Sequence, residues 1–201
     1  LVDLPHDAQL LETRSPDMPM DSGFYPGGKY IYTKQYLCPD NIEGKTILLE
    51  FDGVYMCAEV WVNGQEAAIW PGGYTHFLVP LHKHLKAGQS NEIRVVVDNS
   101  RFPNSRWYTG AGIYRNVKLY EGAQHYIPPY GVQIDTLDYQ TGRIAIRIDA
   151  SHAQGCTAET EILFQDKVAA CAKGFHSECT IPDVQLWSNI HPHLYTAQVR
   201  L

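Results

Sequence analysis

The sequence lacks strongly charged segments, and no run of like charges is longer than two residues. It contains 22 acidic and 16 basic residues, which give a formal net charge of -6 and no basic stripe. Proteins that bind nucleic acid or anionic membranes through electrostatics carry clustered Lys and Arg residues. The charge pattern therefore argues against nucleic acid and against a membrane surface as a partner.

Long apolar runs are also missing, since no stretch approaches the roughly 20 apolar residues that a membrane-spanning helix needs. The chain begins with Leu1 instead of Met, and no basic segment followed by an apolar one opens it. We therefore expect a processed or excised piece of a longer protein. With 44% hydrophobic and 19% charged residues, the composition is that of a soluble globular protein that can build a core.

Cysteine is scarce, and none of the five cysteines belongs to a CxxC pair. An odd number of cysteines in a chain of this size favours a reducing compartment over a disulfide framework, so we expect a cytoplasmic protein, with a periplasmic or secreted location left open. One alternative stays open: Cys171 and Cys179 could face each other across a hairpin and form a disulfide.

Signatures of several enzyme classes are absent: the sequence has no glycine-rich phosphate loop, no GxSxG elbow and no Cys–His nucleophile context. Two histidine pairs have i,i+2 spacing, His82 with His84 and His191 with His193. Zinc needs about four convergent ligands at recognised spacings, which these pairs do not supply. The histidines are expected at the surface or as caps, and the sequence predicts no metal site and no cofactor.

Helical periodicity is nearly absent, because almost every periodic segment has a period of two. Asn63-Gly64 is a strong hairpin turn, since both positions accept a positive φ. The only helix candidate is a short turn around residues 81–85. The chain is therefore predicted to be all-β with antiparallel neighbours. Strands are expected over residues 29–36, 46–51, 55–62, 92–98, 117–120, 143–149, 157–165, 167–173, 176–181 and 195–201.

The residue pattern of the sequence changes near residue 122. Glu121-Gly122 ends a strand, and Pro128–Gly131 blocks regular pairing and is typical of a linker turn. Beyond it, short strands recur at a spacing of about 8–12 residues, as in a small sandwich. We predict two β-sandwiches, over residues 1–122 and 123–201. The second is short for an immunoglobulin-like domain, which typically has about 100 residues.

The most informative segment is Arg106–Arg115, which combines two arginines, three aromatic rings and two glycines. Such a loop presents planar, bidentate donors and flat aromatic faces beside a rigid strand. These groups suit a hydroxyl-rich ligand such as a sugar, and they equally suit the docking of one domain against another. Gly110 and Gly112 are expected to permit a positive φ or a close backbone approach.

Four motifs follow one another along the chain: Leu4–Asp7, Phe51–Gly64, Trp70–Phe77 and Arg106–Arg115. In this order and spacing they resemble the N-terminal sugar-binding jelly roll of glycoside hydrolase family 2, the β-galactosidase, β-glucuronidase and β-mannosidase group. Residues 186–195 resemble the end of that family's next domain. The resemblance covers nearly the whole chain and implies an N-terminal jelly-roll β-sandwich followed by a small immunoglobulin-like β-sandwich.

The resemblance also implies a third domain, a catalytic (β/α)8 barrel that holds both catalytic glutamates and is absent from this chain. The family's acid glutamate follows an asparagine at the end of a barrel strand. Asn91-Glu92 matches that dipeptide by letter only, because it lies in a turn that opens an antiparallel strand. Retaining glycosidases need two carboxyl groups about 5–5.5 Å apart. No such pair can be assigned, so no catalytic residue is expected here.

In the family, the connection that corresponds to residues 98–107 helps some members to shape the sugar subsite. The resemblance therefore marks Asn99, Asn104 and Arg106 as donors to sugar hydroxyls, with Trp107 or Tyr108 as a stacking face. The alternative is structural: Arg106 and Arg115 pair with acids or interdomain carbonyls, and Trp107 fills the core of the sandwich.

Two further rings, Trp70 and Tyr74, lie in a Trp-Pro-Gly-Gly-Tyr loop and are secondary candidates for contact with carbohydrate. They equally suit capping the sandwich or touching a neighbouring domain. Trp61 alternates with Val60 and Val62 beside a hairpin, so it is expected to be a packing residue.

The leading hypothesis is a non-catalytic N-terminal fragment of a family 2 β-glycosidase that supports the missing barrel and shapes its substrate entrance. Its partners would be the downstream barrel and, through the full-length enzyme, a β-glycoside, with a homo-oligomer left open. A β-galactosidase is favoured only as the broadest group. The alternative is a free-standing carbohydrate-binding module, because jelly-roll sandwiches bind sugars widely. An adhesion-type β-protein is disfavoured, since the aromatic loop exceeds what a sandwich connection requires.

Overall fold

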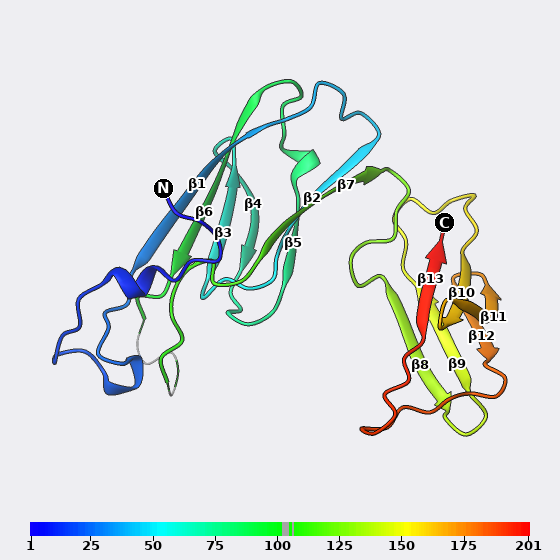
Figure 1. Cartoon of the computed structure of the whole chain (residues 1–201). Coiled ribbons are helices and arrows are strands. Elements are labelled where there is room, and N and C mark those ends of the chain that lie inside the picture. The colour runs from blue at the N-terminus through cyan, green and yellow to red at the C-terminus, as the bar shows by residue number, and fades with distance from the viewer. Residues whose placement is uncertain (102–104, 106) are drawn as a thin grey trace. The chain divides into compact units, whose positions relative to one another are not determined.

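The computed structural model describes residues 1–101, 105 and 107–201, and they form an almost purely β-structure (Figure 1). The all-β prediction is confirmed. The helical elements described are short 3-10 turns, of which η3 (Leu81–Lys83) matches the predicted turn; the others are η1 (Ala8–Leu11) and η2 (Met20–Ser22). None of the helices in the described residues has the length and apolar character to cross a membrane.

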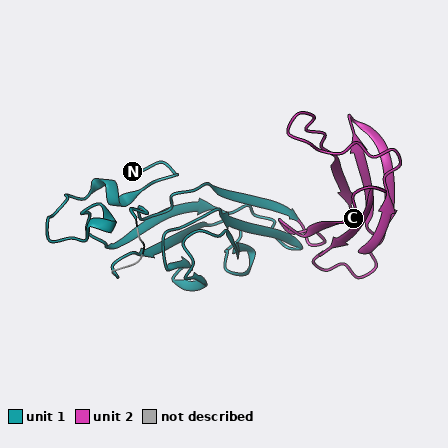
Figure 2. Ribbon diagram, turned by 90° about the horizontal axis from the view of Figure 1, so that it is seen from below, with its two compact units in different colours: residues 1–122 teal, residues 123–201 magenta. Residues whose placement is uncertain are grey.

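The chain divides into two compact units, residues 1–122 (unit 1) and 123–201 (unit 2), shown in different colours in Figure 2. Unit 1 is a sandwich of two sheets with the strand orders β1-β6-β3-β4 and β5-β2-β7. The turn at Asn63-Gly64 joins β3 to β4, as the sequence predicts. Its strands are β1 (Lys29–Leu37), β2 (Lys45–Phe51), β3 (Ala58–Val62), β4 (Gln65–Trp70), β5 (Phe77–Pro80), β6 (Ser90–Asp98) and β7 (Val117–Ala123).

The core of unit 1 lies between these two sheets because alternate side chains of each strand point inward. Ile47 and Phe51 of β2 face Val60 and Val62 of β3 across the sandwich and are buried. The rings of Phe51 and Phe77 stack with their centroids 4.9 Å apart. Burying such a side chain contributes about 1.5–3 kcal/mol relative to leaving it exposed. The period-two pattern of the sequence thus becomes the inner face of a sandwich.

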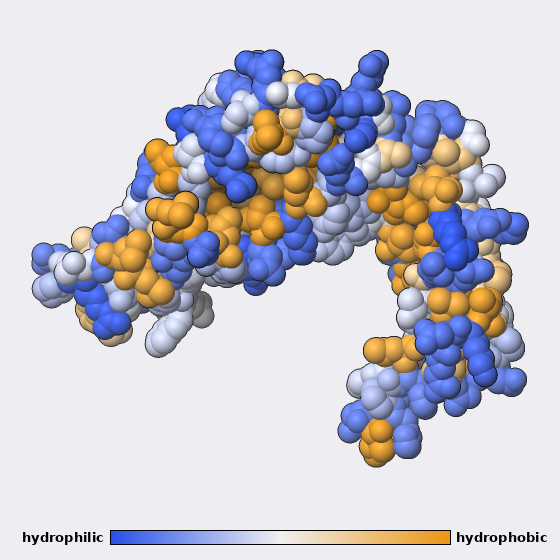
Figure 3. Space-filling model, turned by 45° about the horizontal axis from the view of Figure 1, so that its top comes forward, coloured by the Kyte–Doolittle hydropathy of each residue, from blue (hydrophilic) through white to orange (hydrophobic). Residues whose placement is uncertain are grey.

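Unit 2 is a smaller sandwich with the sheet orders β12-β9-β8 and β11-β10-β13. Ile144, Ile146 and Ile148 share the inner face of β9 and are buried, as their alternation predicts. Both units also expose apolar residues, which appear as separate patches in Figure 3. The strands are β8 (Val132–Asp138), β9 (Arg143–Ile148), β10 (Glu159–Phe164), β11 (Lys167–Lys173), β12 (His176–Thr180) and β13 (Thr196–Arg200).

The five cysteines are free thiols, so the disulfide considered between Cys171 and Cys179 is not formed in this structure. Cys171 lies on β11 and Cys179 on β12. Burial, followed by the neighbouring Cys171, raises the pKa of the Cys179 thiol. A raised pKa keeps that thiol protonated and lowers its reactivity.

A buried asparagine fixes the turns at one end of unit 1. The Asn91 side-chain oxygen accepts hydrogen bonds from Asn63 Nδ2 at 2.7 Å and from the Lys86 backbone amide at 2.8 Å. Its amide nitrogen donates to the backbone oxygens of Lys86 and Gln89. The Asn91-Glu92 dipeptide, which only superficially resembles a catalytic one, therefore holds two turns together.

Replacing Asn91 with Ala will lower the free energy of unfolding by about 3 kcal/mol, because several buried polar groups lose their partner and cannot reach water. Urea denaturation followed by tryptophan fluorescence measures the change. The matched control is Gln89→Ala, whose side chain is exposed and whose backbone oxygen is retained. This control will stay within about 0.5 kcal/mol of the parent chain. Equal losses in both variants would contradict the assignment.

Candidate functional site

The four sequence motifs meet at one end of unit 1, which we call the motif end. It comprises the N-terminal segment and the loops after β2, β4 and β6. Figure 1 shows the N-terminal segment running beside the loop that follows β6. Backbone hydrogen bonds join them, from His6 N to Ile113 O at 2.8 Å and from Ala8 N to Ala111 O at 2.7 Å. Segments that are about 100 residues apart in the sequence therefore form one structural feature.

Asp7 is the centre of this arrangement. One of its carboxylate oxygens accepts hydrogen bonds from the backbone amides of Ala111 at 2.9 Å and Gln9 at 3.1 Å. The other oxygen accepts a hydrogen bond from the Tyr108 hydroxyl, with the two oxygens 2.5 Å apart. Hydrogen bonds to a charged acceptor are stronger than neutral ones. A single carboxylate thus anchors the N-terminal segment and fixes the path of the loop after β6.

The two glycines of this loop are required by its geometry. Gly110 has a φ of 70° and Gly112 a φ of 128°, in the region that favours glycine. A Cβ atom on Gly110 would lie 2.6 Å from Asp7 Oδ2, and one on Gly112 would collide with the Tyr32 hydroxyl. The expectation of positive φ and close backbone approach is confirmed at both positions.

A second set of contacts joins the loop after β6 to the loops after β2 and β4. Tyr55 and Gly112 exchange two backbone hydrogen bonds, at 2.9 and 2.8 Å. The Tyr114 hydroxyl donates to the backbone oxygen of Gly73 at 2.8 Å, and Arg115 Nη1 donates to that of Tyr74 at 3.1 Å. Arg115 therefore bonds a carbonyl inside its own unit, which makes it a structural arginine.

The predicted stacking residues differ in their exposure. Trp107 is 78% exposed and does not fill the core, contrary to the structural alternative considered for it. Tyr108 is half-buried, packs on Tyr25 with ring centroids 5.6 Å apart, and directs its hydroxyl to Asp7. Of these two rings, Trp107 presents the open face.

Of the three predicted hydrogen-bond donors, Asn99 lies within the described residues. Asn99 is 2% exposed, and its side-chain amide donates to the Gly110 backbone oxygen at 3.3 Å. Its backbone amide donates to the Gly28 oxygen at 2.8 Å. In this position Asn99 supports the loop from inside. Asn104 and Arg106 lie outside the described residues, and their roles stay predictions.

The two secondary aromatic candidates, Trp70 and Tyr74, also differ in exposure. Trp70 is half-buried and stacks on Phe77 with centroids 5.5 Å apart and ring planes 17° apart, so it packs against the core. Tyr74 is 58% exposed, and its ring packs in a T-shaped arrangement with that of Tyr55, with ring centroids 5.3 Å apart. Tyr74 therefore offers surface to a ligand or partner, whereas most of the Trp70 ring serves packing.

Sequence reasoning assigned no role to Asp7, Tyr55 or Tyr114, although each stands in a quoted motif. Each acts through a partner that is distant in the sequence, which no local pattern reveals. For Asp7 the available signal was weak: this acidic residue follows Pro5-His6 in a segment with no strand periodicity.

The phenols of the motif end are held in their neutral form. Burial raises the pKa of Tyr108 far above its usual range, and the hydrogen bond to Asp7 and the charge of that residue raise it further. Burial also raises the pKa of Tyr30 to about 12, and the charges of Glu12 and Asp7 add to the effect. Both phenols therefore stay protonated to a higher pH than a free tyrosine does.

The histidine pairs contact protein groups. His82 Nδ1 lies 3.1 Å from the backbone oxygen of Ile47, and the rings of His191 and His193 stack with centroids 6.1 Å apart. Within the described part of the chain, no group of three or more His, Cys, Asp or Glu side chains is placed to hold a metal ion.

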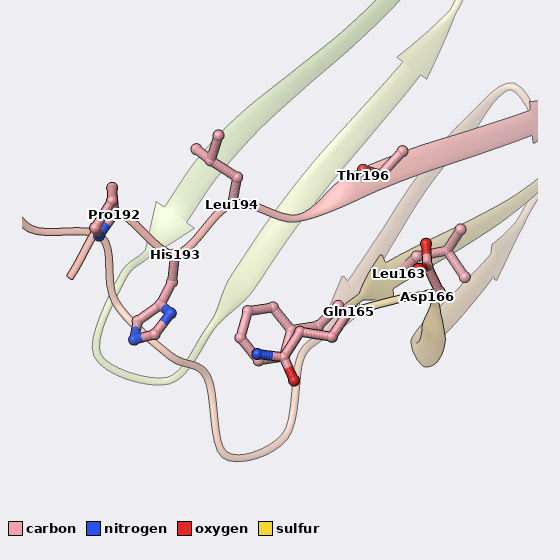
Figure 4. Close-up of a pocket in the computed structure, with 8 residues that line it drawn as sticks. Leu163, Gln165, Asp166, Pro192, His193, Leu194 and Thr196 are labelled. Atoms are coloured by element: carbon pink, nitrogen blue, oxygen red, sulfur yellow. The ribbon is translucent and has the colours of Figure 1, made fainter.

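Two cavities open in unit 2, and the predicted site residues line neither. The smaller has a volume of about 350 Å³ and lies between the turn from β10 to β11 and the segment before β13. Gln165 and His193 approach it from these two segments (Figure 4). The larger has a volume of about 710 Å³ and reaches the inner faces of both sheets of unit 2.

Replacing Asp7 with Asn will lower the pKa of Tyr108, because the tyrosinate no longer meets a negative neighbour, while burial keeps the pKa above that of free tyrosine, about 10. Tyrosinate absorbance measures this shift as the difference between each protein and its Tyr108→Phe counterpart. In the parent chain, Tyr30 and Tyr108 stabilise the fold fully below pH about 10. That contribution is lost as the pH rises through the folded pKa values, from about 10 toward 12 and above. An unchanged Tyr108 pKa would contradict the role of Asp7.

Comparison with known proteins gives consistent relatives. The chain is 30% identical to a β-galactosidase of Bacteroides ovatus over 216 aligned residues, covering 98% of this chain and 25% of that protein. It is 29% identical to a β-glucuronidase of Formosa agariphila, covering 84% of this chain and 21% of that protein. A crystal structure of a β-glycosidase from Bacteroides vulgatus matches with a TM-score of 0.88 at 28% identity, covering 100% of this chain and 28% of that one. The chain thus spans about a quarter of the curated relatives it matches.

Residues 15–123 match the sequence profile described as "Glycosyl hydrolases family 2, sugar binding domain". The matched range includes every strand of unit 1 and the loops of the motif end after β2, β4 and β6. The resemblance drawn from the four motifs is thereby confirmed, and the chain belongs to glycosyl hydrolase family 2.

Proposed function

We propose that this chain is the non-catalytic N-terminal part of a longer family 2 β-glycosidase. In this proposal unit 1 shapes the substrate entrance of a catalytic barrel supplied by the rest of the polypeptide, and unit 2 is the immunoglobulin-like domain that supports the barrel. The similar proteins are named as β-galactosidases and β-glucuronidases, and the chain corresponds to 20–25% of the first two. A β-galactoside is the proposed substrate of the whole enzyme.

The observation that carries the proposal is the exposed ring of Trp107 beside an anchored loop. An indole ring that is 78% exposed contributes little to the folding of its own unit. The loop next to it is held by Asp7 and by the backbone pair of Tyr55 and Gly112. Because the backbone of this loop is fixed before binding, less conformational entropy is lost when a ligand stacks on the ring that it carries. Such a ring suits a sugar face or the rim of a substrate entrance.

The acidic residues support a non-catalytic role. Glu50 lies on β2 and Asp52 directly follows that strand, and Lys118 Nζ contacts their carboxylates at 3.5 and 2.8 Å. The Tyr120 hydroxyl donates to Glu50 at 2.7 Å, and Glu50 is fully buried. A retaining glycosidase instead needs one carboxylate free to attack and a second that carries a proton for the leaving group. Bonded to a lysine and a tyrosine, this pair suits a structural role.

We expect the 201-residue chain to show no turnover of nitrophenyl glycosides, and the longer enzyme to hydrolyse them. In the longer enzyme, Trp107→Ala will reduce kcat/KM about 5- to 10-fold, because one stacking contact is worth about 1–1.5 kcal/mol. Steady-state kinetics with nitrophenyl galactoside, glucuronide and mannoside measures this effect and identifies the preferred sugar.

The matched control is Trp61→Ala. Trp61 lies on the outer face of β3, where it contacts Glu59 and Arg94. Its loss is expected to leave kcat/KM unchanged. Turnover by the purified 201-residue chain would contradict the non-catalytic role, and equal kinetic effects of both substitutions would remove Trp107 from the substrate entrance.

A free-standing carbohydrate-binding module is the second candidate, and the exposure of both Trp107 and Tyr74 favours it. It requires that the 201-residue chain binds sugar by itself. Titration with galactosides, glucuronides and mannosides, followed by tryptophan fluorescence, separates the two candidates. Saturable binding that Trp107→Ala abolishes would favour the module, whereas flat titration curves favour a part that acts only within the longer enzyme.

A further inference from the structure

The outer face of the sheet β1-β6-β3-β4 in unit 1 carries large apolar side chains that stay exposed. Figure 1 shows these four strands side by side. Ile31 on β1 is 62% exposed and Ile69 on β4 is 57% exposed, and neither belongs to the core between the two sheets. Contiguous exposed apolar surface marks a place where another polypeptide binds. The register of the strands shows how these side chains are connected.

The strand register arranges this outer face in two neighbouring rows, because residues opposite each other on paired strands lie about 4.5–5.5 Å apart. The first row, from β1 to β4, consists of Ile31, Val96, Glu59 and Ile69. The second row, two residues further along each of the first three strands, consists of Thr33, Arg94, Trp61 and Glu66. Apolar and charged side chains therefore form one continuous surface across all four strands.

Arg94, near the middle of this face, is held in place by an aromatic ring. Its guanidinium lies over the Trp61 ring, 5.5 Å from the ring centroid. The indole nitrogen of Trp61 in turn donates to a Glu59 carboxylate oxygen at 3.3 Å. Arginine and tryptophan are the residue types that most often dominate the binding energy of protein interfaces.

The ionic contacts of Arg94 differ from those of the arginines on the strands of unit 2. Those arginines pair with carboxylates on neighbouring strands: Arg143 with Glu178 at 2.7 Å, Arg147 with Asp135 at 3.2 Å and Arg200 with Glu161 at 3.2 Å. For the part of the chain that the structure describes, no carboxylate lies within ion-pair distance of Arg94. Its charge is therefore available to a carboxylate of another molecule.

Both rows are complementary to their own reversed copies. A two-fold axis that runs parallel to the strands, midway between β6 and β3, places each row against itself in reverse order. Ile31 then meets Ile69 of the second copy. Arg94 meets Trp61 of the second copy, and Glu59 of that copy lies two residues along the same strand, within reach of a long arginine side chain. The face thus matches a second copy of itself in both shape and charge.

We propose that two copies of this chain associate through the outer faces of their β1-β6-β3-β4 sheets, in aligned face-to-face packing about this axis. Aligned packing is one of the two common arrangements of stacked sheets. From the usual strand spacing and rise, each face measures roughly 500 Å². Two such faces bury about 1,000 Å², the lower limit of a specific interface. The dimer is therefore expected to be weak and reversible.

Sedimentation velocity of the 201-residue chain, from micromolar to submillimolar concentration, tests the association. The mass of the parent chain will rise toward that of a dimer. Arg94→Glu will raise the Kd of the dimer at least about 10-fold, because it sets acidic side chains of the two copies against each other. Adding Glu59→Arg to that variant exchanges the two charges and will restore the Kd to within about threefold.

The matched control is Arg147→Glu, which reverses the charge of an exposed strand arginine in unit 2. It will leave the Kd within about twofold of the parent value, since isolated surface ion pairs contribute little. Urea denaturation of each variant shows that the fold is retained, because Arg94 and Glu59 lie outside the buried core.

Photo-crosslinking tests the predicted register of the two faces. p-Benzoylphenylalanine in place of Ile31 will give a covalent dimer in which the modified residue is joined to the β4 peptide that contains Ile69. The same photoreactive residue in place of Leu119 is the control. Leu119 lies on β7 of the other sheet of unit 1 and is 46% exposed. It will give no covalent dimer.

A chain that stays monomeric over the whole concentration range would overturn the inference. A dimer that Arg94→Glu does not weaken, or that the double exchange does not restore, would also remove this face as the interface. In the longer enzyme, crosslinks from position 31 to a downstream segment of the same polypeptide would identify that segment as the occupant and overturn the second copy. The inference does not rest on the proposed function, because each of these measurements reads mass or crosslinks and none reads glycoside hydrolysis.

Discussion

The Asp7 carboxylate is the interaction on which the motif end of unit 1 depends. It accepts hydrogen bonds from two backbone amides and one phenol, and two of these donors are more than 100 residues away in the sequence. Each hydrogen bond to a charged acceptor contributes about 1.5–3 kcal/mol, which offsets part of the entropy lost when a long loop is ordered. The loop after β6 thereby has a fixed inner part, and the exposed Trp107 stands at its outer edge.

Local patterns were sufficient to predict most of the fold. The alternation in Arg143–Ile148 and the Asn63-Gly64 turn depend on neighbours in the sequence, so the strand and the hairpin could be recognised directly. The pairing of β1 with β6, in contrast, joins Lys29 to Asp98 and follows from the packing of the whole sandwich. Period two shows that a strand exists and which face is apolar, but not which strand lies beside it.

The candidate site was predictable in position but not in the role of each residue. Trp70 and Trp107 both stand beside glycine-containing loops, and nothing local separates them. The separation comes from tertiary contacts, because Trp70 finds Phe77 to stack on while Trp107 stays exposed. Asn99 is a similar case: its polar side chain suits a sugar, yet it is satisfied by a backbone oxygen of the loop it supports. Whether a polar or aromatic residue packs or binds depends on distant partners.

The two units complete their cores to different degrees. Among the described residues of unit 1, fourteen buried side chains form one core, and the contacts of the motif end tie its loops together. In unit 2 the buried core has seven side chains and remains open beside β13. Small domains bury a smaller fraction of their surface and are correspondingly marginal in stability. Each buried apolar side chain therefore supplies a larger share of the total stability of unit 2 than of unit 1, although the free energy gained per unit of buried area is the same.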